Sequence, residues 1–213
     1  KYRSHMSRGV TIGTMLQDEA LRFIRLGTFL ERADNTARIL EVKYLNLLPG
    51  SDEEMQSADY YQWSALLRSV SAFEVYRRVY RDQINPLRVA ELLILRADMP
   101  RSLARCMKEV YSNLARVANS RSAETERLAG ELEAHLHFGR IEGIFEGGMR
   151  KYLENFRDRI FDLGCRISDH FLIPAGTVQP AFVQSIPLAL GNLTLEGHTV
   201  QSSDLKPGSP LVV

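Results

Sequence analysis

The stretch FLERADNTARIL, residues 29–40, holds the pattern that decides the fold of this chain. Its apolar residues recur at spacings of three and four, which is typical of an amphipathic helix that buries one face. Followed outward, the same apolar stripe begins near Phe23 and ends near Leu48, where a Pro-Gly pair stops the helix. Thr14 can cap the start of this helix. The sequence therefore predicts one long helix over residues 14–48.

A ribbon of charged residues follows the border of this apolar stripe. On a helical wheel Asp34 and Glu41 lie at the border, Glu31 and Arg38 lie just beyond it, and Arg32 points away to solvent. Such a ribbon can be a salt-bridged edge where the helix meets a neighbour. It can also be a polar site whose half-buried carboxylates have tuned pKa values. The pattern favours the salt-bridged edge and leaves the polar site open.

Helical periodicity continues to Leu172 and indicates an all-α protein, a bundle of about six helices of which two are long. The later helices are expected over residues 60–81, over LRVAELLILR after Asn85-Pro86, after Asp98 and Pro100, and over 123–138 and 141–172. LRVAELLILR is apolar nearly all round, so it should lie in the centre of the bundle. Gly143, Gly147 and Gly148 fall inside the last pattern, where each costs about 1 kcal/mol relative to Ala. Close helix packing is the default explanation for these glycines, with a bend or a pocket wall as the alternatives.

The last part of the chain differs in composition from the bundle. Residues 174–213 hold five of the eight prolines and only three charged residues. We predict two parts, a helical domain over 1–173 and an irregular, extended, Pro-rich tail over 174–213. The tail could form one hairpin around NLTLEGHTV. Its apolar share argues that it packs on the bundle or on another subunit, so a homo-oligomer stays open.

Composition excludes several classes of function. The net charge of +1 gives no electrostatic case for nucleic-acid binding. No apolar run approaches the roughly 20 residues that span a bilayer, so no membrane association is expected. Cys106 and Cys165 stand alone in helical patterns, which favours buried free thiols in a reducing cytoplasm.

Few motifs for chemistry are present. The sequence contains no nucleophile signature and no phosphate-cradling glycine loop, so no cofactor is expected. It also lacks the Glu-x-x-His pairs of a di-metal bundle, so no metal is expected, and Glu131 with His135 is interpreted as a surface pair. Arg101 and Ser102 fall in the first turn of a predicted helix. They could hold an anion there, although a helix cap is the favoured role.

Three segments together resemble the bacterial alpha-E family, which is named for its helices and a glutamate. They are GTMLQDEALRFIRLGTFLERADNTARILEVKY, LRVAELLILRADMPRSLARC and YLENFRDRIFDLGCRISDHFL, and the resemblance covers residues 9–173. By this match Glu31 is the name-giving glutamate, with Arg32, Asp34 and Arg38 around it. Family members are usually longer at the N-terminus, where an earlier helical segment carries a related ERA-type motif. The resemblance implies that this portion, and with it a partner of Glu31, is missing here.

The resemblance also implies a biochemical setting. Genes of the family lie beside those of circularly permuted ATP-grasp ligases, transglutaminase-like peptidases and, in some operons, a proteasome-like peptidase. The chain is therefore expected to be an accessory or scaffold subunit of a peptide or amide-bond system, with an ATP-grasp ligase or a transglutaminase-like protein as its partner. The alternative is an enzyme of the same pathway. In that case Glu31 and Asp34 are the acid/base groups, and Arg38, Arg101 and Ser102 bind the substrate.

Overall fold

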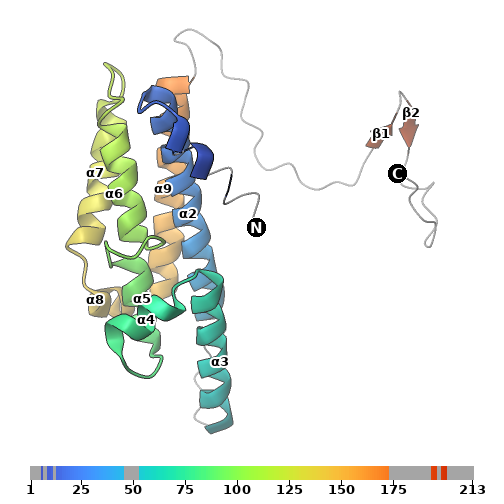
Figure 1. The fold of residues 1–213 in the computed structure, drawn as a ribbon, viewed down its shortest axis with the longest axis vertical. Coiled ribbons are helices and arrows are strands. Elements are labelled where there is room, and N and C mark those ends of the chain that lie inside the picture. Colours follow the sequence, from blue (N-terminus) through green and yellow to red (C-terminus); the bar gives the residue numbers. More distant parts are fainter. Residues whose placement is uncertain are drawn as a thin grey trace. The chain divides into compact units, whose positions relative to one another are not determined.

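The computed structural model describes residues 6, 9–11, 13–45, 53–172, 193–195 and 198–200 (Figure 1). Most of these residues are helical, which confirms the predicted all-α class. The only strands among them, β1 (Leu193–Leu195) and β2 (His198–Val200), pair antiparallel and form the hairpin predicted around NLTLEGHTV. The chain divides into two units, Lys1–Ile173 and Pro174–Val213, and the helices below all belong to the first. The predicted packing of the tail falls on residues outside the described part.

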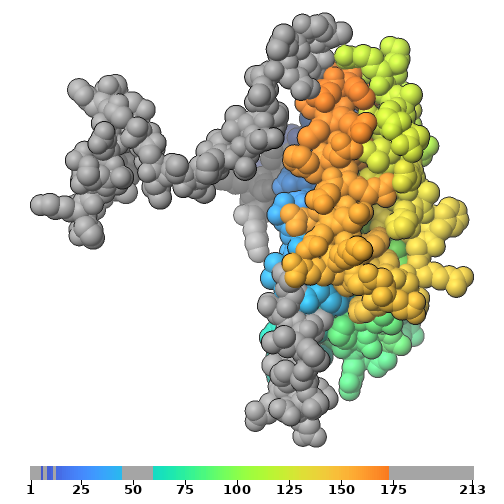
Figure 2. Space-filling model, turned by 180° about the vertical axis from the view of Figure 1, so that it is seen from behind, coloured from blue at the N-terminus to red at the C-terminus, as the bar shows by residue number. Residues whose placement is uncertain are grey.

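Four helices make up the bundle. They are α2 (Glu19–Leu45), α6 (Leu103–Leu114), α7 (Ala123–His137) and α9 (Met149–Ile167). α2 packs against α6 and α9, and α7 packs against the same two helices, so the four form a ring in chain order. Successive helices of the ring run in opposite directions (Figure 1). Aromatic contacts at the two ends of α2 agree with this, because Phe23 meets Phe171 while Tyr44 meets Phe145. α2 lies in front of α9 in Figure 1, and α9 comes to the front in the reverse view of Figure 2.

Four further helices lie beside the bundle, and three of them pack around the fourth, α5 (Pro86–Ile94). The three are α3 (Glu53–Ser69), α4 (Phe73–Tyr80) and α8 (Ile141–Glu146). α5 packs against α3, α4, α6 and α8, and Val89, Ala90 and residues 92–94 of it are fully buried. This confirms the predicted central position of the apolar segment. The start of α5 is also as predicted, since the Asn85 side chain accepts a hydrogen bond from the Leu87 N–H and Pro86 is the first helical residue.

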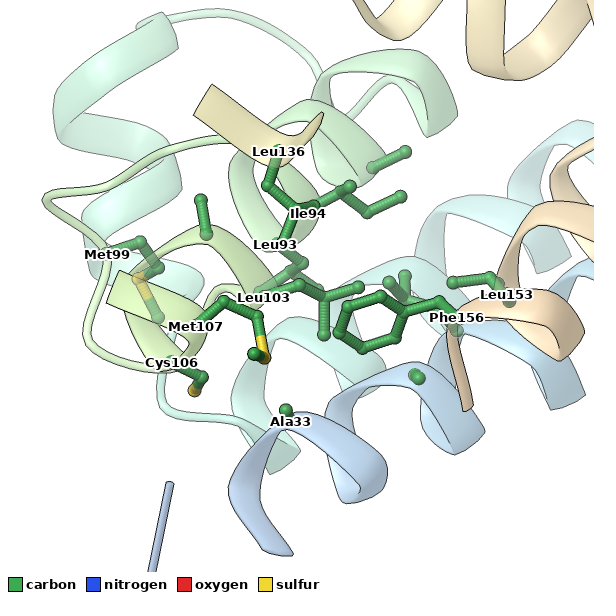
Figure 3. Close-up of a cluster of buried hydrophobic side chains, with 14 of the residues drawn as sticks. Ala33, Leu93, Ile94, Met99, Leu103, Cys106, Met107, Leu136, Leu153 and Phe156 are labelled. Carbon is green, nitrogen blue, oxygen red and sulfur yellow. The ribbon is translucent and has the colours of Figure 1, made fainter. Parts of the chain in front are cut away.

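The core contains the predicted apolar stripe of α2. Leu26, Ala33, Ala37 and Leu40 are at most 1% exposed. Ala33 faces Cys106 and Met107 of α6, with Phe156 of α9 beside them (Figure 3). Fully burying a leucine contributes about 1.5–3 kcal/mol, while the small alanines let the helix backbones approach each other. Leu48, the predicted end of the stripe, lies outside the described residues.

The predicted start of the first helix is wrong in detail. The long helix begins at Glu19, and the Asp18 carboxylate caps it by accepting a hydrogen bond from the Leu21 N–H. The Thr14 hydroxyl instead donates to the carbonyl oxygen of Val10 (2.8 Å). Thr14 is therefore bonded to the preceding turn and does not cap the long helix.

The helix predicted over residues 60–81 is broken at Ser71. Ser71 has φ 57°, and the Ala72 N–H bonds to the carbonyl oxygen of Leu67 while the Ser71 N–H bonds to that of Arg68. This pair of hydrogen bonds is a Schellman motif, which normally has glycine at the left-handed position. The break carries no glycine or proline, so the sequence gives no signal for it.

The helix predicted over residues 141–172 is also divided. α8 ends at Glu146, and Gly148 precedes α9 with φ +91°, a conformation that side chains with a Cβ rarely adopt. A short π-helix, η1 (Ser168–Leu172), continues from α9. A Cβ added at Gly143 or Gly148 would meet no atom within 4 Å. The default explanation of close helix packing is therefore wrong at these two positions, and the bend is confirmed.

The two glycines should respond oppositely to alanine. Gly148→Ala should lower the free energy of unfolding by about 1–3 kcal/mol, because alanine strains at positive φ. Gly143→Ala should raise it by up to about 1 kcal/mol, because the helical backbone there leaves room for a methyl group. Urea unfolding followed by circular dichroism measures both changes. Equal destabilisation by the two substitutions would contradict this account of the break.

Candidate functional site

The charged ribbon of α2 is bound by one arginine from α9. The Arg157 guanidinium donates from Nη1 to Glu41 Oε2 (2.6 Å) and from Nε to Asp34 Oδ1 (3.4 Å). Arg38 Nε donates to the other oxygen of Asp34 (2.6 Å). Burial alone would lower the pKa of the Arg157 guanidinium, but its hydrogen bonds and charge interactions with Glu41 and Asp34 together outweigh burial and raise that pKa above its usual range. Arg157 therefore stays charged and joins α9 to two carboxylates that lie two turns apart on α2. This is the salt-bridged edge that the pattern favoured.

Glu31 lies outside this network. Its side chain is exposed, and it makes no hydrogen bond or ion pair within the part of the chain that the structure describes. Asp34, three residues on, is one-third exposed and contacts two guanidinium groups. The two predicted acid/base residues therefore sit in different surroundings.

Arg32 does not point to solvent as predicted. It is half-buried, its guanidinium lies 5.0 Å from the centre of the Phe29 ring, and its Nη1 donates to the carbonyl oxygen of Pro100 (3.2 Å). One turn along α2, the buried Thr36 hydroxyl donates to the carbonyl oxygen of Arg101 (2.9 Å). These two residues fasten the turn before α6 onto α2. The wheel could not place Arg32, because the turn that it binds comes 68 residues later.

Ser102 caps the start of α6, which is the role that the sequence pattern favoured. Its side chain is fully buried, accepts a hydrogen bond from the Arg105 N–H (3.0 Å) and donates to the carbonyl oxygen of Arg96 (2.5 Å). α6 begins only at Leu103, so Arg101 and Ser102 precede the helix and are not in its first turn. The Arg101 side chain is half-buried, and its role as a substrate-binding residue stays a prediction.

The predicted site residues do not meet at one place. Asp34 lies on the flank of α2 that faces α9, with Arg38 bonded to it from the outward side, whereas Arg101 and Ser102 lie against the flank that faces α6. Glu31 lies between these flanks, on the outward side of the helix. No single ligand position touches all five residues in this arrangement.

Glu131 and His135 contact different partners. Glu131 accepts hydrogen bonds from Arg159 and Arg127, while the His135 ring stacks on Tyr152, so the predicted Glu131–His135 pair is wrong. Within the described residues, no group of three or more metal-ligating side chains comes together. None of the described helices is both long and apolar enough to cross a membrane.

The structure adds a pocket that the sequence did not single out. It has a volume of about 440 Å³ and lies between α7, α8 and α9. Gly143 and Gly147 form part of its wall, which supports the alternative explanation for these glycines. The sequence contains the basic residues of its rim, Arg140, Lys151 and Arg159. Only the break at Gly148 brings them together, and the sequence pattern does not show that break.

A comparison with known protein families matches the sequence of this chain to a described domain. The model of the Alpha-E family, a predicted alpha-helical domain with a conserved ER motif, matches residues 1–172. The chain belongs to the Alpha-E family. No curated protein and no solved structure matches it.

The dipeptide Glu-Arg occurs twice in this Alpha-E chain. At 31–32 the glutamate is exposed on α2, and the arginine fastens the turn before α6. At 126–127 the glutamate accepts a hydrogen bond from the Ser122 hydroxyl beside the start of α7, and the arginine is ion-paired at the surface. The first pair lies in the segment on which the family resemblance rests. There one residue stabilises the fold while its neighbour stays accessible.

Removing the charge of Arg157 should destabilise the fold. Arg157→Met keeps most of the packing but leaves Glu41, which is 15% exposed, without its ion pair. We expect a loss of about 1–3 kcal/mol in the free energy of unfolding. Arg38→Met removes an exposed i,i+4 pair and should cost less than about 0.5 kcal/mol. Chemical unfolding measures both values, and equal effects would exclude Arg157 as the structural bridge.

The two cysteines should differ in reactivity. Burial raises the pKa of the Cys106 thiol to about 12, so almost no thiolate forms near neutral pH. Cys165 is only half-buried, which corrects the prediction of two buried thiols. At pH 8, iodoacetamide should label Cys165 at least about 100-fold faster than Cys106 in the native protein, because the thiolate is the nucleophile. Mass spectrometry measures the rates. Both cysteines should react alike in urea, and similar native rates would show that Cys106 is accessible.

Proposed function

We propose that this chain is an accessory or scaffold subunit of a bacterial peptide or amide-bond system, and that it docks a protein partner through the outward face of α2. The observation that carries the proposal is the position of Glu31. The glutamate of the ER pair lies exposed on this face, without the partners that a buried catalytic acid would need.

The outward face of α2 is a continuous stripe. It consists of Ile24, Glu31, Asn35, Arg38 and Val42, all exposed and spaced by three, four or seven residues. Ile24 and Val42 are 46% and 60% exposed, so each end of the stripe offers an apolar contact. Charged and amide groups lie between these ends, where they can set the register of a partner. Such a mixed stripe resembles the surface of a non-obligate interface.

The geometry gives less support to an enzyme. Asp34 is held by Arg38 and Arg157, so a proton transfer to it would have to weaken two ion pairs. The described residues supply no group that orients Glu31. A general acid or base must be positioned within hydrogen-bond reach of the reacting group. The enzyme of the same pathway remains the alternative, with Glu31 and Asp34 as acid/base groups and Arg38 and Arg101 as substrate-binding residues.

The partner follows from the family resemblance. Family genes neighbour those of ATP-grasp ligases and transglutaminase-like proteins, and we propose the ATP-grasp ligase as the partner. The chain would hold this ligase or present its peptide substrate.

A pull-down with an ATP-grasp ligase of the kind encoded beside family genes tests the proposal. Binding should occur with or without nucleotide, and Glu31→Lys combined with Val42→Asp should weaken it at least about tenfold, a loss of about 1.4 kcal/mol. Phe161→Asp is the matched control, because Phe161 is 70% exposed on α9 and lies outside the stripe. No binding under either condition would reject the scaffold role. Equal weakening of binding by Phe161→Asp would reject the outward face of α2 as the docking surface.

A second variant separates docking from catalysis. Glu31→Gln should leave activity of the assembled system intact if the residue only docks the partner, apart from any change in affinity. Loss of a ligation or hydrolysis activity with unchanged partner binding would instead favour the enzyme.

A further inference from the structure

We propose that the pocket between α7, α8 and α9 binds a small carboxylate ligand that carries an apolar group, such as an N-acylated hydrophobic amino acid or the C-terminal residue of a peptide. The pocket is separate from the outward face of α2, and the inference does not depend on partner docking.

The interior of the pocket suits an apolar group. Its volume of about 440 Å³ falls within the range of about 300–1,000 Å³ that is common for ligand sites. Leu132, Ile144 and Phe156 contribute apolar atoms to its lining, and each is otherwise almost completely buried. Apolar surface predominates in the lining, so transferring a hydrocarbon or aromatic group into it would be favourable.

The rim of the pocket is positive. Arg140, Lys151 and Arg159 belong to the lining, which contains no aspartate or glutamate. Arg159 is already bound to Glu131 (2.6 Å). Arg140 and Lys151 are exposed and form no ion pair or side-chain hydrogen bond within the described residues. Two uncompensated cations therefore remain at the mouth of an apolar pocket, and this charge is complementary to one anionic group.

A carboxylate fits this arrangement better than a phosphate. Arginine binds a carboxylate through two parallel hydrogen bonds, and a lysine can neutralise the same group as a point charge. The pocket supplies these two donors and a large apolar interior, whereas phosphate sites commonly add a nest of backbone N–H groups. The chemistry thus indicates a ligand with a small anionic end and a hydrophobic body.

One wall of the pocket is aromatic. The rings of His135 and Tyr152 are stacked, with their centres 6.1 Å apart and their planes 22° apart, and both residues line the pocket. Burial raises the pKa of the Tyr152 phenol to about 12, so this group stays neutral at physiological pH and adds no negative charge beside an anion. The wall offers a flat surface to an aromatic or aliphatic side chain.

Gly143 is the glycine of the pocket wall at which a side chain can be added. A Cβ at Gly139 would lie 2.8 Å from the carbonyl oxygen of His135, so the local backbone itself requires that glycine. At Gly143 a Cβ meets nothing within 4 Å, so packing does not fix the size of the residue there. A large side chain at Gly143 would extend into open space along the pocket wall, which makes this position a direct way to fill the pocket.

The binding test uses N-acetyl-L-phenylalanine, with its primary amide as the matched uncharged ligand. Titration calorimetry of the full chain should detect the acid, and the amide should bind at least about tenfold more weakly. Binding of the acid and amide with equal affinity would overturn the proposal, as would no binding of the acid up to 10 mM ligand, a concentration of about tenfold the weakest Kd expected. Inorganic phosphate is the third probe, and competition by phosphate at the same concentration as the acid would also overturn it.

Variants locate the site. Arg140→Gln with Lys151→Gln should weaken binding of the acid at least about tenfold, and Gly143→Phe should abolish it. Arg150→Gln is the matched control, because Arg150 neighbours Lys151 but pairs with Glu154 and does not line the pocket. Gly143→Ala controls for folding and should retain binding. Unchanged affinity in the Arg140/Lys151 variant, or equal loss in the Arg150 control, would overturn the assignment.

A peptide distinguishes the two sources of the carboxylate. A tetrapeptide that ends in phenylalanine should bind as tightly as the N-acetyl amino acid if the site takes peptide C-termini. Tenfold weaker binding of the peptide would assign the site to the free acid. Both results support a carboxylate pocket, and tight binding of the C-terminally amidated peptide would overturn it.

Discussion

The structure depends on how α2 is buried on both of its flanks. Ala33 and Ala37 have no exposed surface, so α6 and α9 can approach the backbone of α2 and close the ring with α7. This close approach brings the polar border of α2 against its neighbours, where unpaired charges would be costly. On the α9 side Arg157 pairs with the carboxylates of this border. On the α6 side Arg32 and Thr36 donate hydrogen bonds to the turn before α6. The close packing along the apolar stripe and the polar contacts beside it therefore depend on each other.

The same constraint separates the two residues of the ER pair. Successive residues of a helix are about 100° apart, so Arg32 lies at the α6 flank while Glu31 remains on the outward face. A requirement for arginine can thus be structural even if a requirement for glutamate comes from a partner. Conservation of a dipeptide does not imply that both of its residues have the same role.

The sequence predicts the features that depend on periodicity, and it misses those that depend on contacts between distant segments. The stripe of α2, the buried position of α5 and the cap at Ser102 follow from local patterns that tertiary packing reinforces. The break at Ser71 was missed because serine takes a position where glycine is usual. Arg157 could not be matched to Glu41, since 116 residues separate them. The pocket was missed for the same reason, because its rim forms only once α8 and α9 are separated at Gly148.

The order of helices in the ring also bears on how the chain folds. α6 and α7 are neighbours in sequence and can pair after closing a short loop, whereas the contact between Arg157 and Asp34 spans 123 residues. Closing a long loop costs more chain entropy, so contacts of high sequence separation tend to form late. We therefore expect the α2–α9 seam to be the last part of the ring to assemble and the first to open in native-state hydrogen exchange. The seam that Arg157 bridges would then limit the kinetic lifetime of the folded domain.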